Sequence, residues 1–197
     1  MSVEQWRLFI ALELPADTLA ALTATQEQLQ REAPPRTVRW VRPAGIHLTL
    51  KFLGDTPAHQ QEAISTALHN AASDQGPLLL RAAGLGCFPN VRRPRVVWVG
   101  LDGDMAPLRA LYEAVETALT PLGFPREKRG FSLHLTLGRV RREASPDAVQ
   151  NLGRLIEQTK IGTLHTWTAA TVSLVRSELH PDGARYTVLS HAPLLGL

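Results

Sequence analysis

Two short stretches of this chain decide its fold: His47-Leu48-Thr49-Leu50 and His134-Leu135-Thr136-Leu137. The same four residues recur after a shift of 87 residues, from position 47 to position 134, and this shift also places the apolar run 10–14 on the run 97–101. Solenoid proteins repeat every 20–50 residues or so, so one longer repeat indicates a single duplication instead. The helical segments between these runs align less closely under the shift. The sequence therefore predicts two pseudo-equivalent halves.

Each His-Leu-Thr-Leu segment has the alternation of a β-strand. Successive side chains of a strand point to opposite faces, so both leucines lie on one face while histidine and threonine share the other. The leucines can anchor the strand in a core, and the imidazole and hydroxyl, about 7 Å apart along the strand, then point away from it. A four-residue match carries a false-positive risk. Its recurrence at equivalent positions favours a functional role for both pairs.

Hydrophobic periodicity predicts the order β-α-β-α-β, the same order again, and one more hairpin strand. We therefore expect the α+β fold class, with two pseudo-symmetric βαβαβ lobes. Their mainly antiparallel sheets would line a shared central cleft, and the helices would lie outside. We expect residues 1–197 to form a single domain of intertwined lobes, with approximate sequence halves 1–93 and 94–197. Strands are expected at 7–14, 46–53, 78–85, 95–101, 132–140, 161–177 and 184–189, helices at 15–32, 56–71, 105–122 and 146–156, and a turn at 180–183.

Composition excludes several classes of protein. With 197 residues, 44% of them hydrophobic and 20% charged, the chain is neither disordered nor fibrous. Cys87 is the only cysteine, which excludes an intramolecular disulfide and a cysteine-based metal cage. A free thiol fits a reducing compartment, so we expect a cytoplasmic protein. No stretch has the 18 or more apolar residues of a membrane span, and the first residues lack the pattern of a signal peptide.

Two imidazoles and two hydroxyls that converge across a cleft suit a tetrahedral phosphate. In-line hydrolysis of a phosphodiester needs a base behind the entering water and an acid at the departing oxygen. Histidine can serve as a base or as an acid near neutral pH. One ring would therefore be neutral and act as the base, and the other would be protonated and act as the acid. A strained cyclic phosphodiester needs no metal for this. The other five histidines form no metal-binding pattern, so we expect no metal and no cofactor.

Arginine makes up all but three of the 21 basic residues, and its fork-shaped guanidinium suits phosphate. Two arginine-rich stretches stand out, 92–95 and 139–142, and the second follows the second motif directly. Strict alternation would place Arg139 on the leucine face, but Gly138 just before it can relax the backbone and redirect that side chain. Phe9 and Trp98 are candidates for stacking on a base, although strand aromatics more often pack in a core.

With its paired His-x-Thr segments, the chain resembles the 2H phosphoesterase superfamily, and within it the bacterial and archaeal RNA 2′,3′-cyclic phosphodiesterases, also called RNA 2′-5′ ligases. The stretches 7–12, 47–54, 94–100 and 183–189 carry this closer resemblance. It implies a hydrolase that opens the 2′,3′-cyclic phosphate of an RNA end to a 2′-phosphomonoester without metal, and a reverse 2′-5′ ligation. Many members have proline before the second histidine, where this chain has Leu133.

The resemblance also implies roles for individual residues. His47 would be the proton donor to the departing 3′ oxygen and His134 the base that activates water, while Thr49, Thr136 and Arg139 would bind the substrate. The expected partners are RNA ends or nucleotides with a 2′,3′-cyclic phosphate, with no membrane, and we expect a monomer. Two alternatives stay open: an RNA-end-binding module without turnover, and a 2H phosphodiesterase that acts on small cyclic nucleotides.

Overall fold

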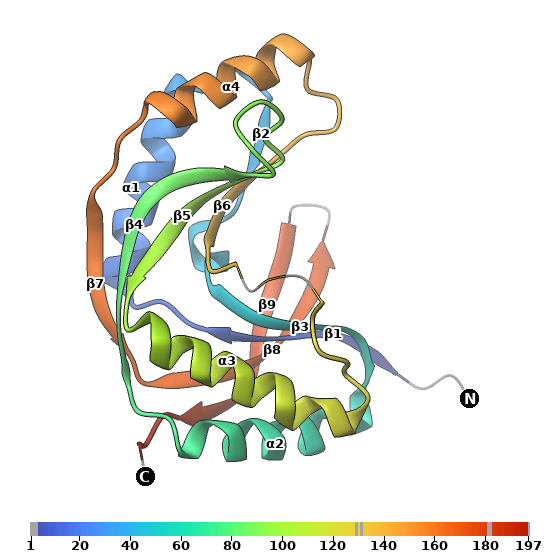
Figure 1. Ribbon diagram of the computed structural model, residues 1–197. Coiled ribbons are helices and arrows are strands. Elements are labelled where there is room, and N and C mark those ends of the chain that lie inside the picture. The colour runs from blue at the N-terminus through green and yellow to red at the C-terminus, as the bar shows by residue number, and fades with distance from the viewer. Residues whose placement is uncertain (1–3, 129, 131, 181–182, 197) are drawn as a thin grey trace.

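Two antiparallel sheets form the framework of the computed structural model, which describes residues 4–128, 130, 132–180 and 183–196 (Figure 1). The fold is α+β with two lobes, as the sequence predicts. The four-stranded sheet has the order β3 (Leu48–Pro57), β1 (Gln5–Leu12), β8 (Thr171–His180), β9 (Gly183–Pro193). The five-stranded sheet has the order β2 (Val38–Trp40), β6 (Leu135–Val140), β5 (Val96–Gly103), β4 (Leu78–Phe88), β7 (Thr163–Ala169).

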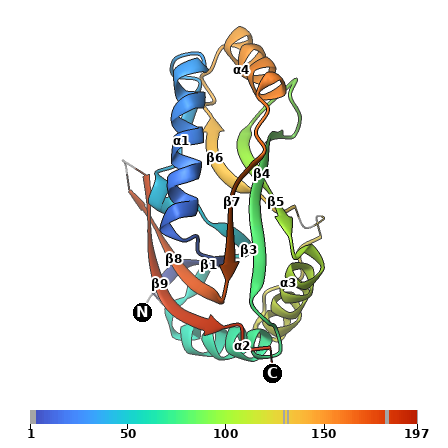
Figure 2. The ribbon, with the colours of Figure 1, turned by 90° about the vertical axis from the view of Figure 1, so that its left-hand side faces the viewer.

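The helices lie on the outer sides of the two sheets (Figures 1 and 2). Helices α2 (Gln61–Ser73) and α3 (Met105–Leu119) pack together beside the four-stranded sheet. Helices α1 (Ala16–Glu32) and α4 (Pro146–Gln158) pack against β7 and β4 of the five-stranded sheet. Each lobe thus takes one helix from each half of the chain. Short 3-10 turns are η1 (Pro43–Gly45), η2 (Ala58–Gln60) and η3 (Thr120–Leu122).

The duplication holds in the strand register, residue by residue. In the β1–β3 ladder Ala11 pairs with Thr49 and Leu12 with Leu48, and in the β5–β6 ladder Trp98 pairs with Thr136 and Val99 with Leu135. Every partner in the second ladder lies at the shift of 87 residues from its counterpart in the first. The helices follow the shift only in part, as the sequence predicts. Helices α1 and α3 end 87 residues apart, at Glu32 and Leu119, but they begin 89 residues apart, and α4 begins 85 residues after α2.

The single strand expected at 161–177 is in fact two strands in different sheets. Strand β7 pairs with β4, and β8 pairs with β1, so the chain crosses from one sheet to the other at Ala170. The main-chain oxygen of Ala170 accepts a hydrogen bond from the amide of Leu194, 2.9 Å away. Ala170 alone separates the two strands, and no glycine or proline marks the crossing, so the sequence shows no break.

Three smaller expectations also need correction or completion. Strand β3 does not stop at Gly54 but continues to Pro57, because Gly54, with φ of 73°, sits at a β-bulge. The next helix therefore begins at Gln61 rather than at Thr56. Strand β2 was not predicted, since three residues are too few to show the alternation of apolar and polar residues by which a strand is recognised. The expected turn at 180–183 includes residues 181 and 182, which lie outside the described residues.

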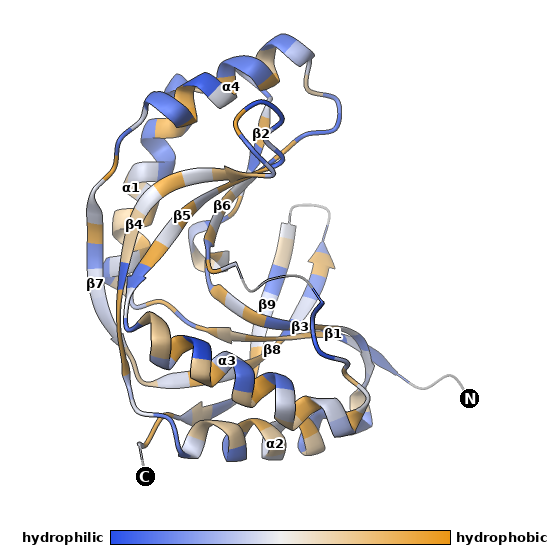
Figure 3. Ribbon diagram, in the orientation of Figure 1, coloured by the Kyte–Doolittle hydropathy of each residue, from blue (hydrophilic) through white to orange (hydrophobic). Residues whose placement is uncertain are grey.

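Apolar packing is divided between one large core and one small cluster. The large core lies between the sheets and the helices, where apolar and polar residues alternate along each helix (Figure 3). The small cluster consists of Phe9, Ala11 and Val175, with Val188 against it, on the opposite face of the four-stranded sheet. Within the described residues, no helix has both the length and the apolar character needed to span a membrane.

A buried ion pair fixes the segment before the second motif. Lys51, in β3, places its Nζ 2.8 Å from Oε2 of Glu116 in α3, and both side chains are at least 95% buried. The same Nζ donates to the main-chain oxygen of Pro125, and Glu116 Oε2 accepts from the amide of Glu127. Strand β3, helix α3 and the chain leading to His134 are therefore joined at one point.

Replacing one partner of this pair should destabilise the protein strongly. In Lys51→Met, Glu116 would keep a buried charge without its partner, and we expect the free energy of unfolding to fall by about 3–5 kcal/mol. Urea denaturation followed by circular dichroism measures this. The double variant Lys51→Met/Glu116→Leu should recover much of the loss, and Arg81→Ala, at an exposed pair with Asp102, should change little. Equal effects of Lys51→Met and Arg81→Ala would contradict the interpretation.

Candidate active site

His47 lies one residue before β3, where the backbone holds its imidazole in one orientation. Its Nδ1 is 2.8 Å from the main-chain oxygen of Gly45, at the end of the η1 turn. A carbonyl oxygen only accepts hydrogen bonds, so Nδ1 carries the hydrogen. In the neutral ring the free lone pair is then on Nε2, the nitrogen that can exchange a proton with a ligand.

His134 repeats this arrangement in the other sheet. It lies one residue before β6, and its Nδ1 is 2.8 Å from the main-chain oxygen of Ser132. In both segments the accepting carbonyl belongs to the residue two positions before the histidine. The two imidazoles are therefore held in the same tautomer by the same local contact, and each can act as acid or base through Nε2.

Aromatic side chains contact both imidazoles, and burial lowers the pKa of each ring. Phe9 stacks on His47 with a centroid separation of 4.6 Å, and Tyr186 meets His47 edge-on at 5.1 Å. Phe88 makes an edge contact with His134 at 4.9 Å. Burial lowers the pKa of both imidazoles below the ordinary value of 6.5, and the hydrogen bonds to Gly45 and Ser132 oppose this. The positive charge of Arg139 lowers the pKa of His134 further.

The predicted alternation within the two motifs is confirmed by their burial. Leu48, Leu50, Leu135 and Leu137 are all at most 4% exposed and belong to the large core. The histidines and threonines between them are partly exposed on the other face. Within the described part of the chain, neither threonine hydroxyl has a hydrogen-bond partner, so each is free to donate to a ligand.

A β-bulge at the last leucine of each motif redirects the residues that follow. In the β5–β6 ladder Trp98 pairs with Thr136 and Val96 with Arg139, so Leu137 is the extra residue. Val96 and Trp98 share a face of β5, and Arg139 therefore lies on the face of Thr136. This is the redirection that Gly138 suggested, and the bulge is its cause.

The first motif has the same bulge. Ala11 pairs with Thr49 and Phe9 with Phe52, so Leu50 is the extra residue and Phe52 lies on the face of Thr49. Phe52 is thus the counterpart of Arg139 under the duplication. Sequence reasoning missed Phe52, because strict alternation along β3 would place it differently and nothing in the sequence marks the bulge.

Arg39 is a second residue that the sequence reasoning missed. In β2 it pairs directly with Arg139 of β6, so the two guanidiniums share a face at the edge of the five-stranded sheet. Both are exposed, and within the described residues neither has a carboxylate partner. Like charges directly opposite each other destabilise a sheet. The pair therefore indicates a binding position for an anion.

The chain between β2 and β3 fixes the first motif beside the second. The amide of Val41 donates to the main-chain oxygen of Leu137, and the compact η1 turn follows. Gln26 of α1, which is 3% exposed, donates from Nε2 to the oxygens of both Val41 and Leu137, at 2.8 Å each. Figures 1 and 2 show the beginnings of β3 and β6 near each other in both views.

Other candidates take structural roles. Phe9 is only 3% exposed and stacks on His47, and Trp98 packs against Phe88 with a centroid separation of 5.1 Å. His165 is hydrogen-bonded to Thr18, far from either motif in the sheet order. Among the described residues, no group of three or more histidine, cysteine, aspartate or glutamate side chains is placed to hold a metal ion.

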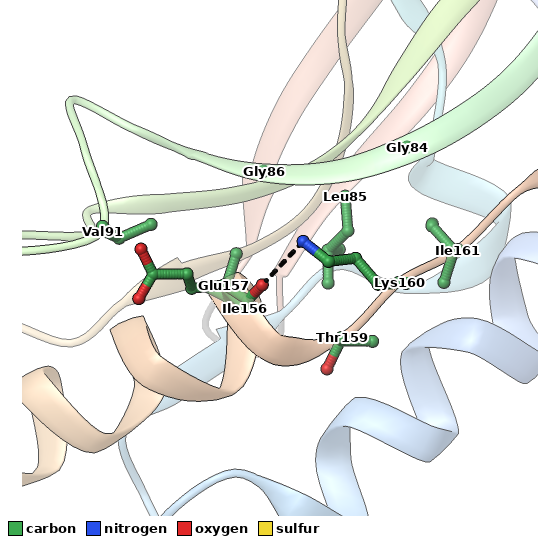
Figure 4. A pocket seen from close by; sticks show the side chains of 9 residues that line it. All are labelled: Gly84, Leu85, Gly86, Val91, Ile156, Glu157, Thr159, Lys160 and Ile161. Atoms are coloured by element: carbon green, nitrogen blue, oxygen red, sulfur yellow. Dashed lines mark hydrogen bonds between the residues drawn. The ribbon is translucent and has the colours of Figure 1, made fainter.

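A hollow of about 330 Å³ between β4 and the end of α4 contains none of the predicted site residues (Figure 4). Within this hollow the ammonium group of Lys160 donates a hydrogen bond of 3.2 Å from Nζ to the main-chain oxygen of Glu157. It is lined by Gly84, Leu85, Gly86, Val91, Ile156, Glu157, Thr159, Lys160 and Ile161.

Known proteins are similar to this chain in both sequence and fold. An RNA 2′,3′-cyclic phosphodiesterase of Thermus thermophilus is 33% identical over 195 residues, covering 96% of this chain and 91% of the relative. A protein of the same name from Methanothermobacter thermautotrophicus is 30% identical over 181 residues, covering 92% of this chain and 95% of the relative. Both matches thus cover more than nine-tenths of this chain.

Solved structures have a similar fold. The crystal structure of TT0787 from Thermus thermophilus superimposes with a TM-score of 0.79 at 31% identity, covering 96% of this chain and 98% of that chain. E. coli LigT in complex with 3′-AMP shares the fold with a TM-score of 0.76 at 24% identity, over 97% and 99% of the two chains. The model of the LigT-like phosphoesterase family matches twice, at residues 12–98 and 99–186, once for each copy of the duplication. The chain therefore belongs to the LigT-like phosphoesterase family.

Proposed function

We propose that this protein hydrolyses the 2′,3′-cyclic phosphate at an RNA end to a 2′-phosphomonoester, with His47 and His134 on opposite sides of one phosphorus atom. The observation that carries the proposal is the equivalence of the two His-x-Thr segments. They share backbone register, bulge position and imidazole tautomer. The relatives named RNA 2′,3′-cyclic phosphodiesterase supply the substrate class.

The reaction needs two proton transfers, and the two Nε2 atoms supply both. Neutral His134 takes a proton from water as the water oxygen attacks phosphorus. The bond from phosphorus to O3′ breaks, and protonated His47 gives its proton to O3′ as that oxygen leaves. The phosphate stays on O2′. Because the five-membered cyclic diester is strained and its leaving oxygen is protonated directly, the proposed reaction requires no metal.

The remaining residues hold the phosphate while its charge grows. The hydroxyls of Thr49 and Thr136 donate to the two non-bridging oxygens, one from each sheet. Arg139 lies on the face of Thr136 and places a positive charge beside the developing dianion. When an RNA 5′-hydroxyl takes the place of water, the same steps form a 2′-5′ phosphodiester, which is the 2′-5′ ligation.

Replacing either imidazole should remove one proton transfer. His47→Ala and His134→Ala should each lower kcat at least about 10²-fold on an oligonucleotide with a 2′,3′-cyclic end, in excess EDTA. Chromatography of the product against 2′-phosphate and 3′-phosphate standards measures both rate and outcome. His69→Ala, at an exposed histidine of α2, is the matched control and should retain full activity.

Three results would contradict the proposed mechanism: activity that EDTA abolishes, activity kept in both histidine variants, or a 3′-phosphate product. Binding of the cyclic end without turnover in the wild-type protein would favour the RNA-end-binding module instead.

The pH dependence should reflect the lowered pKa values of the free protein. The productive form has one protonated and one neutral imidazole, and it is most populated midway between the two apparent pKa values. Burial lowers both, so kcat/KM should follow a bell with its maximum below pH 6.5. A bound anionic phosphate favours the protonated rings, so the maximum of kcat should lie at a higher pH. A kcat/KM maximum above pH 7.5 or so would contradict this reading.

Arg39 should contribute to binding of the RNA chain through its charge. For a single strand, the logarithm of affinity falls with the logarithm of salt concentration by about 0.7 for each phosphate contact. Arg39→Ala should weaken oligonucleotide binding and make this slope about 0.7 shallower, as fluorescence anisotropy can measure. Arg81→Ala, on the same sheet but paired with Asp102, should leave the slope unchanged. An unchanged slope in Arg39→Ala would exclude a phosphate contact there.

A further inference from the structure

A pocket lies at the end of the five-stranded sheet where β2 begins and β6 ends. The two strands pair as far as Val38 and Val140, and one residue further the amide of Arg141 donates to the main-chain oxygen of Thr37, 2.8 Å away. The pocket has a volume of about 520 Å³ and lies between the turn before β2 and the loop before α4 (Figure 1). It is lined by Pro35, Arg36, Thr37, Arg141, Glu143, Ala144, Ser145 and Ala148.

Two arginines give this pocket its positive charge. Within the described residues the guanidinium of Arg36 has neither a hydrogen bond nor an ion pair. The guanidinium of Arg141 is 3.5 Å from the carboxylate of Glu143, and an exposed ion pair of this kind is weak. Ser145 accepts a hydrogen bond from the amide of Ala148, so the beginning of α4 is capped by its own residue. Both guanidiniums are therefore available to an anion.

The backbone of Arg36 is unusual for an arginine. Its φ is 58°, in the left-handed region that favours glycine, and within the described residues no other residue except glycine has a positive φ. Strain of this kind is found mainly at functional positions such as those that hold a ligand. Since no contact of the guanidinium inside the described chain accounts for an arginine here, a ligand from outside the chain is the remaining explanation.

The pocket continues a line of arginines that begins at the proposed catalytic site. Arg139 lies on the face of Thr136, and Arg39 pairs with Arg139 from β2. The pair of Thr37 and Arg141 lies two residues further along the same two strands, a distance of about 7 Å. Positive charge along a groove that follows the backbone is how proteins bind single-stranded nucleic acid. A strand whose cyclic end lies between the two motifs can therefore place its upstream phosphates along this line.

We propose that the pocket between Arg36 and Arg141 is a subsite for an internucleotide phosphate of the RNA chain upstream of the cyclic end, an inference that rests on the proposed function. A guanidinium can contact two phosphate oxygens at once, so the two arginines hold the phosphate from two sides. Phosphate contacts carry no information about the bases, so the subsite accepts any sequence. It favours an oligonucleotide over a mononucleotide, because a mononucleotide has no upstream phosphate.

The experiment compares substrates of different length. The variant is Arg36→Gly, because glycine removes the guanidinium and fits the left-handed backbone. In the wild-type protein kcat/KM should rise from a nucleoside 2′,3′-cyclic phosphate to a hexanucleotide with the same cyclic end. Arg36→Gly should lower kcat/KM about tenfold for the hexanucleotide, since one hydrogen bond between charged groups contributes about this much. For the mononucleotide the change should be less than about twofold.

A second variant and a matched control complete the comparison. Arg141→Ala should show the same dependence on substrate length as Arg36→Gly. In both variants the slope of log affinity against log salt, measured by fluorescence anisotropy with the hexanucleotide 2′-phosphate, should be about 0.7 shallower than in the wild type. Arg109→Ala, at an exposed arginine of α3 without a partner among the described residues, should change neither quantity.

Three results overturn the subsite. The first is equal kcat/KM of the wild type and Arg36→Gly on the hexanucleotide. The second is an equal loss on both substrates, which would give Arg36 a structural role. The third is weaker inhibition by inorganic phosphate in Arg36→Gly with no change on the hexanucleotide, which would make the pocket a site for a free anion.

Failure of the proposed function is distinguishable from failure of the subsite. If the wild-type protein turns over neither substrate, the proposed function fails, and anisotropy with fluorescently labelled 2′-phosphate products decides the subsite. Weaker binding of the hexanucleotide alone in Arg36→Gly supports the subsite. An equal change for the hexanucleotide and the mononucleotide, or no change, overturns it.

Discussion

A one-residue bulge at the last leucine of each His-Leu-Thr-Leu segment is the constraint on which the site depends. Before the bulge, alternation buries the leucines and exposes histidine and threonine. At the bulge, Leu50 and Lys51 both lie opposite Ile10 and point into the core, and Leu137 and Gly138 lie opposite Val97. The strand can therefore bury an extra residue and still return Phe52 and Arg139 to the site face. Without the extra residue, these two side chains would point toward the helices.

The two sheets must also be held in a fixed relation, and the exchange of helices does this. Helix α1 follows β1 of the four-stranded sheet yet packs on the five-stranded sheet, where Gln26 binds the oxygens of Val41 and Leu137. Lys51 and Glu116 form the corresponding link on the other side, from β3 to the helix of the second half. A buried amide that leaves its partners unsatisfied is costly, so these links resist sliding of one motif past the other.

Much of this could be predicted from sequence, because alternation and helical periodicity are local. The two motifs, their faces, their core leucines and most helices followed from spacing alone. The bulge in the first motif could not be predicted, since an extra residue changes which partner faces each position and no glycine marks it there, whereas Gly138 indicated the redirection in the second motif. Strand β2, and Arg39 with it, was missed because three residues have no period. The crossing at Ala170 was missed because a single residue separates the two strands and no glycine or proline marks the change of sheet.

The places where the duplication is broken are as informative as those where it holds. A symmetric pair of imidazoles can serve acid and base equally well, but the proposed reaction needs an acid on one side of the phosphorus and a base on the other. At the first position beyond the bulge where both copies return to the site face, the chain has Phe52 in one sheet and Arg139 in the other. A guanidinium suits phosphate oxygens, whereas an aromatic ring carries no charge. These two residues therefore distinguish the two sides of a site whose two imidazoles are held alike.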